Sequence, residues 1–169
     1  MRSSIVMTMA AISSVMSPGI AGSSDPASPM AIVRGFLSEV RSGRDPDAIT
    51  RYFAPHVQAH QITSEAETTV DRTPEDYANH VREFLRTYGR FSFRIEDMIA
   101  QDDRVFVRWR QDGHHLASVD GERPTGGRVT EITTAVYRVS GGKIREYWIQ
   151  SDRKGLEVQL QRLAATIRP

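Results

Sequence analysis

Apolar residues recur every three or four positions through the first half of the chain. This spacing is typical of helices that bury one face, and it covers residues 28–40 and 73–89. An Asp-Pro pair opens a short helix over residues 45–53, because proline fits the first helical turn. A Thr-Pro-Glu-Asp capping signal begins the third helix. The pattern therefore predicts three helices, with an irregular polar segment at residues 55–72.

The spacing changes to strict alternation after residue 89. Apolar and polar residues alternate over residues 91–96 and 105–111, and again in the last third of the chain. There two strands, 129–137 and 144–149, flank Gly141-Gly142, a pair suited to a two-residue hairpin turn. Helices followed by antiparallel strands predict an α+β fold. We expect a curved antiparallel sheet covered by three N-terminal helices, with one more helix at the end.

Composition fits one ordinary domain. The chain has 169 residues, of which 39% are hydrophobic and 25% charged, and its net charge is +1. The sequence contains no block of basic residues of the kind that indicates a nucleic-acid partner. Cysteine is absent, which excludes disulfides, thiol catalysis and zinc–thiolate sites.

The N-terminal segment allows two interpretations. Residues 1–26 form either a signal peptide, cleaved after Ala21, or a disordered extension of a domain at 27–169. The first predicts an exported or periplasmic protein and the second a cytoplasmic one. No apolar run reaches the roughly 20 residues that span a bilayer, so no membrane partner is expected.

Five segments, in order along the chain, carry a family resemblance. They are SGRDPDAITRYFAPHVQAH, RVFVRWRQDGHH, the PTG turn, VYRVSGGKIREYW and the final D…GL…QL. Over about residues 30–163 the chain resembles the SnoaL-like polyketide cyclase family of the nuclear-transport-factor-two superfamily. The resemblance implies a cone-shaped α+β barrel whose pocket takes a small apolar molecule without a cofactor. It also implies a homodimer formed through the outer sheet face, here Ile132, Thr134, Val136 and Trp148.

The chain departs from the family at its catalytic carboxylate. Cyclases of the family place an acid directly after the residue that here is Trp148, and this chain has Ile149 there. The family's partner histidine falls at Ala135. A hydrocarbon cannot accept a proton, so proton abstraction needs another group or does not occur.

Two residues are candidates for that group. Alternation puts Glu131 on the face of Ala135, where it is a possible replacement base. The alternative is an exposed acid near the start of the strand, paired with Arg128 or Arg145. His115 shares the face of Trp109 and could exchange a proton with a substrate oxygen near neutral pH. A hydrogen-bonded histidine at a strand end is the alternative.

Five residues are expected to contact the substrate if the hairpin lines a pocket. They are His60, Trp109, Tyr137, Tyr147 and Ile149. His56 and His60 are four apart, but Pro55 precedes them and no acid completes a set, so we expect no metal.

Two functions of different classes follow. One is a cofactor-independent cyclase or isomerase that abstracts a proton from a polyketide-like apolar substrate. The other is a non-catalytic ligand-binding or dimerisation protein of the same fold, which the hydrocarbon at Ile149 favours.

Overall fold

The computed structural model describes residues 27–119 and 121–167. The predicted signal peptide or extension, residues 1–26, lies outside the described residues. The elements, in chain order, are α1 (Pro29–Phe36), the π-helix η1 (Leu37–Arg41), the 3₁₀ helix η2 (Pro46–Arg51), β1 (Phe53–Ile62), β2 (Glu67–Arg72), α2 (Pro74–Tyr88), β3 (Ser92–Gln101), β4 (Arg104–His114), β5 (Arg128–Ser140), β6 (Lys143–Ser151) and α3 (Arg153–Ile167).

The six strands form one curved sheet in the order β2-β1-β6-β5-β4-β3. The α+β class predicted from the sequence is confirmed, and two details differ. The sheet is mixed, because β1 runs parallel to β6 while the other neighbours are antiparallel. It is also unclosed, with β2 and β3 as its edges.

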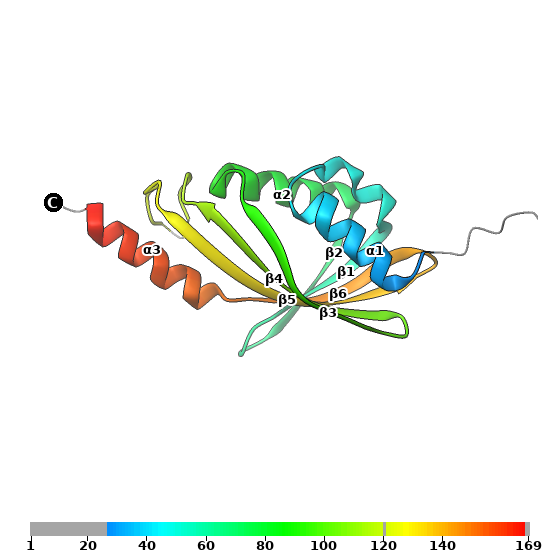
Figure 1. The fold of residues 1–169 in the computed structure, drawn as a ribbon. Helices are drawn as coiled ribbons and strands as arrows, with labels where there is room; N and C mark the ends of the chain where they lie inside the picture. Colours follow the sequence, from blue (N-terminus) through cyan, green and yellow to red (C-terminus); the bar gives the residue numbers. More distant parts are fainter. Residues whose placement is uncertain (1–26, 120, 168–169) are drawn as a thin grey trace, which may run out of the picture.

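The helices divide into a covering layer and an end piece. α1 and α2 lie on one face of the sheet, which we call the inner face, and α3 lies alongside the far end of β5 (Figure 1). Leu37, Val40 and Val81 are fully buried beneath this layer. No helix in residues 27–119 and 121–167 has the length and apolar character that a membrane crossing requires.

Two strands occupy the segment that the sequence predicts as irregular. The second helix ends at Arg51, and the chain then forms β1 and β2 over residues 53–72. β2 escapes a pattern-based prediction because it is an exposed edge strand, in which only Arg72 is even partly covered. β1 carries an irregularity in its pairing between Phe53 and Gln58, which interrupts its alternation.

The closing hairpin forms as the sequence predicts. Gly141 and Gly142 have φ angles of 59° and 72°, a conformation that other residues seldom adopt. Beyond this turn β5 and β6 pair with Tyr137 opposite Tyr147 and Ala135 opposite Ile149. Because side chains alternate along each strand, the side chains of these four residues point to the inner face.

A side chain replaces the missing strand where β6 ends. β6 pairs with β5 only as far as Thr133, which leaves an unpaired β5 edge beyond it. At Thr130, Gln159 of α3 accepts from the backbone N–H at 2.9 Å and donates to the carbonyl at 2.8 Å. This pair satisfies backbone groups that would otherwise be open and ties α3 to the sheet.

Candidate functional site

The inner face of β4 and β5 carries matched rows of side chains. Val105 lies opposite Tyr137 and Val107 opposite Ala135, while Trp109 lies opposite Thr133 and Gln111 opposite Glu131. Successive rows are about 7 Å apart, because alternate residues of a strand are separated by two rises of about 3.4 Å. We call the first two rows the aromatic half and the last two the polar half, after the side chains that cover them.

The aromatic half is packed solid. Tyr137 and Tyr147, whose ring centres are 5.8 Å apart, are 1% and 4% exposed. Phe36, Phe53 and Tyr77 pack against them from the helical layer and β1. Burial raises the pKa of Tyr137, and the nearby Tyr77 and Tyr147 add to the rise. Both predicted substrate contacts, Tyr137 and Tyr147, thus lie in a filled core as neutral phenols.

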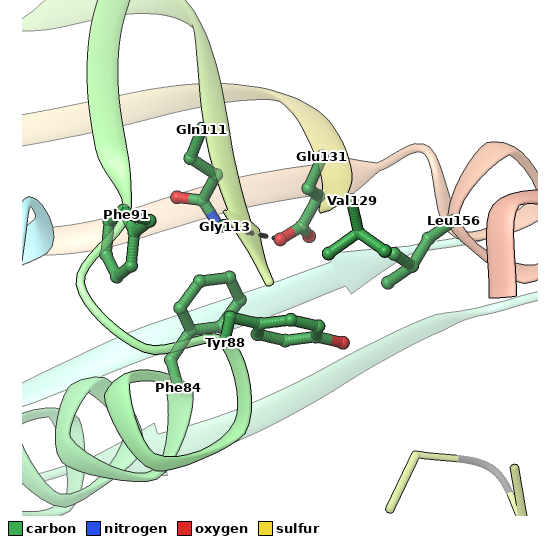
Figure 2. A pocket seen from close by; sticks show the side chains of 8 residues that line it. All are labelled: Phe84, Tyr88, Phe91, Gln111, Gly113, Val129, Glu131 and Leu156. Carbon is green, nitrogen blue, oxygen red and sulfur yellow. Dashed lines mark hydrogen bonds between the residues drawn. The ribbon is translucent and has the colours of Figure 1, made fainter. Parts of the chain in front are cut away.

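The polar half borders a small cavity of about 10 Å³, close to the space that one water molecule needs. Figure 2 shows Gln111 and Glu131 side by side on one wall, with the rings of Phe84 and Tyr88 facing them from α2. Its lining residues are Phe84, Tyr88, Phe91, Gln111, Gly113, Val129, Glu131 and Leu156. The cavity is mainly apolar and holds one carboxylate.

That carboxylate is held from one side only. Gln111 Nε2 donates a hydrogen bond of 2.7 Å to Glu131 Oε2. Within the described residues no other hydrogen bond reaches Glu131, so its Oε1 has no protein donor there. The pair leaves Gln111 Oε1 buried and unpartnered in the same part of the chain. The wall of the cavity therefore presents one carboxylate that a single side-chain amide holds.

The close approach of α2 to β4 beside the cavity depends on one glycine. A Cβ at Gly113 would lie 2.7 Å from the backbone oxygen of Tyr88, which is closer than real Cβ contacts. Only glycine allows the end of α2 to approach β4 so tightly. The two aromatic rings from α2 are thereby held over the carboxylate wall.

Buried polar atoms without hydrogen-bond partners gather around this half. Among the described residues they include Trp109 Nε1, Gln111 Oε1, His115 Nε2 and Arg41 Nη1. Buried polar atoms without a hydrogen-bond partner are rare in folded proteins, so a group of them marks this half as unlike the aromatic half. The sequence prediction named Trp109 and His115 but missed Arg41, which extends the buried stripe of the first helix by one residue.

His115 sits one row beyond the cavity wall. It is fully buried, and its Nδ1 lies 3.3 Å from Thr125 Oγ1 while its backbone pairs with Gly126 and Gly127. It does not line the cavity described above. Its predicted role in proton exchange stays a prediction.

Ile149 lies beside Ala135, in the second row of the aromatic half. It is partly buried opposite Ala135 and packs against the core, outside the cavity lining. The family's usual acid position is therefore part of the packed wall in this chain.

His60 lies on the opposite, outer face of the sheet. Its ring stacks on Trp148 with centres 4.9 Å apart, and its Nε2 lies 3.0 Å from Glu146 Oε1. It is separated from Glu131 by the sheet itself. Among the described residues, no group of three acid, cysteine or histidine side chains is placed to hold a metal ion.

The chain matches one family of known proteins by sequence. The family model described as SnoaL-like polyketide cyclase matches residues 31–160. No curated protein matches the chain by sequence.

Several solved structures share the fold. A proposed polyketide cyclase from Acidithiobacillus ferrooxidans is 23% identical, with a TM-score of 0.70, and the match covers 81% of this chain and 97% of that one. IdmH, a proposed polyketide cyclase from Streptomyces antibioticus, is 22% identical with a TM-score of 0.67, covering 80% and 99%. AclR, a proposed hydroxylase from Streptomyces galilaeus, is 20% identical with a TM-score of 0.66, covering 79% and 81%. The fold thus carries more than one proposed chemistry.

Proposed function

Because the chain belongs to the SnoaL-like polyketide cyclase family, we propose that it is a cofactor-independent cyclase or isomerase acting on a flat, polyketide-like substrate. The observation that carries the proposal is the Gln111–Glu131 pair on the wall of an apolar cavity. In this proposal Glu131 takes over the proton abstraction for which Ile149 is unsuited.

The reaction begins at a carbon flanked by carbonyl groups. Glu131 Oε1 accepts its proton, and the electrons of the C–H bond pass into an enolate. In a cyclase the enolate carbon then forms a bond to a second carbonyl of the same substrate. The resulting alkoxide regains a proton from Glu131, which restores the carboxylate. Gln111 keeps the carboxylate oriented throughout.

The substrate must displace side chains, because the cavity holds only about 10 Å³. Phe84 and Leu156 are the movable walls, since both are only partly buried and come from the ends of helices. Flat rings fit between such apolar side chains. We expect Phe84 and Leu156 to separate when the substrate binds.

The test is solvent deuterium incorporation into 2-tetralone, a bicyclic ketone that serves as a simpler probe with C–H bonds next to one carbonyl, against the rate in buffer alone. The wild-type protein is expected to accelerate exchange, and Glu131→Gln to reduce the acceleration by about 10²-fold or more. Glu83→Gln, at an exposed acid of α2, is the matched control. Exchange by Glu131→Gln at the wild-type rate would remove Glu131 as the base.

A non-catalytic binding protein is the second candidate. Two observations support it: Ile149 stands in place of an acid, and the aromatic half has no open space. This candidate predicts saturable binding of flat apolar molecules with no exchange above the buffer rate. The deuterium measurement therefore separates the two.

We also propose a homodimer through the outer sheet face. Ile99, Phe106, Val136 and Trp148 lie opposite one another across β3, β4, β5 and β6, and form an apolar row. Ile99 is 65% exposed and Phe106 36%, so the row gains cover from a second copy. Phe106→Glu should convert a sedimenting dimer to monomer, and a wild-type monomer at micromolar concentration would contradict the proposal.

A further inference from the structure

A buried arginine without a counter-ion lies next to the polar half. Arg41 is 4% exposed, and its Nη1 has no hydrogen-bond partner in the described part of the chain. None of the ion pairs among the described residues includes it. A buried charge carries a desolvation penalty that proteins normally offset with an acid. Within residues 27–119 and 121–167 no acid offsets the charge of Arg41.

Aromatic rings are the only partners of this cation that the structure shows. Its guanidinium carbon lies 4.9 Å from the centre of the Phe84 ring and 5.7 Å from that of Trp109. Cation–π contacts favour a guanidinium but leave its N–H groups without acceptors. The donor Trp109 Nε1 and the acceptor Gln111 Oε1 are buried and unpartnered as well. Two donors and one acceptor are thus open in one region.

The backbone of the first helix brings Arg41 into this region. The residues Leu37–Arg41 form a π-helix, in which Ser42 N–H donates to the Leu37 carbonyl at 2.9 Å. The wider turn changes the rotation of the helix and places Arg41 on the buried face with Val40. Such turns are uncommon and are often found at functional sites.

We propose that Arg41 binds an anionic oxygen of the ligand, with Trp109 Nε1 as a second donor. The ligand class is a flat molecule that carries an enolate or carboxylate oxygen. This inference rests on the proposed ligand pocket and adds to it the charge of the bound species. The ligand oxygen supplies the counter-charge that Arg41 lacks among the described residues, and the aromatic rings beside Arg41 match a flat ring system.

Phe84 links the two parts of the site. Its side chain lines the cavity beside Glu131 and also contacts the Arg41 guanidinium. A change of rotamer at this one partly buried residue would join the cavity to Arg41. A ligand could then place its acidic carbon near Glu131 and its oxygen near Arg41, which would stabilise the enolate as it forms.

The experiment measures binding by calorimetry, with no turnover required. The probes are 2-naphthoate, its neutral isostere 2-naphthamide, and 2-phenyl-1,3-indandione, which is an enolate at neutral pH. Arg41→Met keeps most of the side-chain volume and removes the charge. It should weaken binding of 2-naphthoate by about 10- to 100-fold and leave 2-naphthamide binding unchanged. If Arg41→Met weakens binding of the indandione as well, the site accepts both carboxylate and enolate oxygens. If it weakens binding of only one of the two anions, the site accepts that kind of oxygen alone.

The matched control is Arg44→Met, which removes the same charge at an exposed position three residues further on. It should bind all three probes as the wild type does. Equal binding of both anions by Arg41→Met and wild type would overturn the inference, as would a wild-type protein that binds neither anion. In both cases, binding of 2-naphthamide would leave the proposed pocket standing.

Because Arg41→Met could misfold, its thermal unfolding is measured as well. Removal of an unpaired buried charge should leave the melting temperature equal to or above that of the wild type. Arg41→Lys keeps the charge without the planar fork and should retain part of the anion affinity. If Arg41→Met unfolds, preserved anion binding by Arg41→Lys with unchanged 2-naphthamide affinity supports the inference, and equal loss of all probes overturns it.

Discussion

The two halves of the inner face use the same strands and differ in how completely they are packed. In the aromatic half the rings of Phe36, Tyr137 and Tyr147 fill the space, and their side chains are 0–4% exposed. In the polar half, Trp109 and Gln111 are equally buried yet have unpartnered polar atoms. Burial is therefore equal in the two halves, and they differ in their unsatisfied hydrogen-bonding groups.

The two halves also differ in what they contribute to the stability of the fold. Neutral phenols in the aromatic half contribute packing, and burial holds the pKa of Tyr147 above its ordinary value. The polar half keeps an open carboxylate oxygen and an unpaired guanidinium, both of which cost stability. Incomplete packing is expected where a ligand completes the structure.

The largest expected effect is the loss of stability when an aromatic ring is removed from the aromatic half. Phe36→Ala, in the aromatic half, should lower the free energy of unfolding by about 3–5 kcal/mol, because a fully buried ring is lost. Phe84→Ala should cost about half as much, since Phe84 is partly buried and borders the cavity. Urea denaturation measures both. Equal losses would contradict the contrast between the halves.

The next-largest expected loss of stability comes from a charge placed at Ile149. Ile149→Asp should destabilise the fold by about 2–4 kcal/mol at pH 7, because a carboxylate would be partly buried among core residues. It should not raise deuterium exchange, since Ile149 lies outside the cavity lining. Ile149→Asn controls for the loss of packing. A gain of exchange in the Asp variant would show that the substrate reaches the family's usual position.

A smaller effect concerns the attachment of α3 to the polar half. Gln159→Leu removes both hydrogen bonds to the backbone of Thr130 and should cost about 1–2 kcal/mol. Hydrogen exchange at the Thr130 amide should accelerate, while amides of the aromatic half stay protected. Gln161→Leu is the control, because the Gln161 side chain donates a hydrogen bond to Glu157 within α3 and none to the sheet among the described residues. Unchanged protection at Thr130 would mean that α3 is held by its apolar contacts alone.

The smallest effect is a sensitivity to acid beside the polar half. On the outer face the Thr130 hydroxyl, with help from Arg110, holds the pKa of Asp112 below its ordinary value of 3.8. Its stabilisation is therefore present above about pH 4 and is lost as pH falls through the lowered pKa.

Asp112→Asn should cost about 0.5–1 kcal/mol at pH 7 and shrink the loss of stability between pH 4 and pH 2. Urea denaturation across this pH range gives the comparison with wild type. An identical pH dependence in the two proteins would exclude Asp112 as a source of the acid sensitivity.

Alternation along the strands was enough to predict which side chains share the inner face. Glu131, Ala135 and Tyr137 face inward as expected. The sequence did not show that Glu131 meets Gln111, because that contact depends on the register between strands joined by a long loop.

Other parts depend on contacts that no local pattern records. His60 was expected at the pocket and lies on the outer face, where β1 joins β6 in parallel after an irregular pairing. A shift of one residue in a strand moves a side chain to the other face. Arg41 was missed because a charged residue at the end of a helix ordinarily points to water.

The most direct test of the central claim is a crystal structure of the protein with 2-naphthoate bound. The account predicts the ring between Phe84 and the Gln111–Glu131 wall, with its carboxylate about 3 Å from Arg41 Nη1. Naphthoate seated instead in the open groove lined by Glu122, Arg153 and Glu157, with the polar half unchanged, would contradict it.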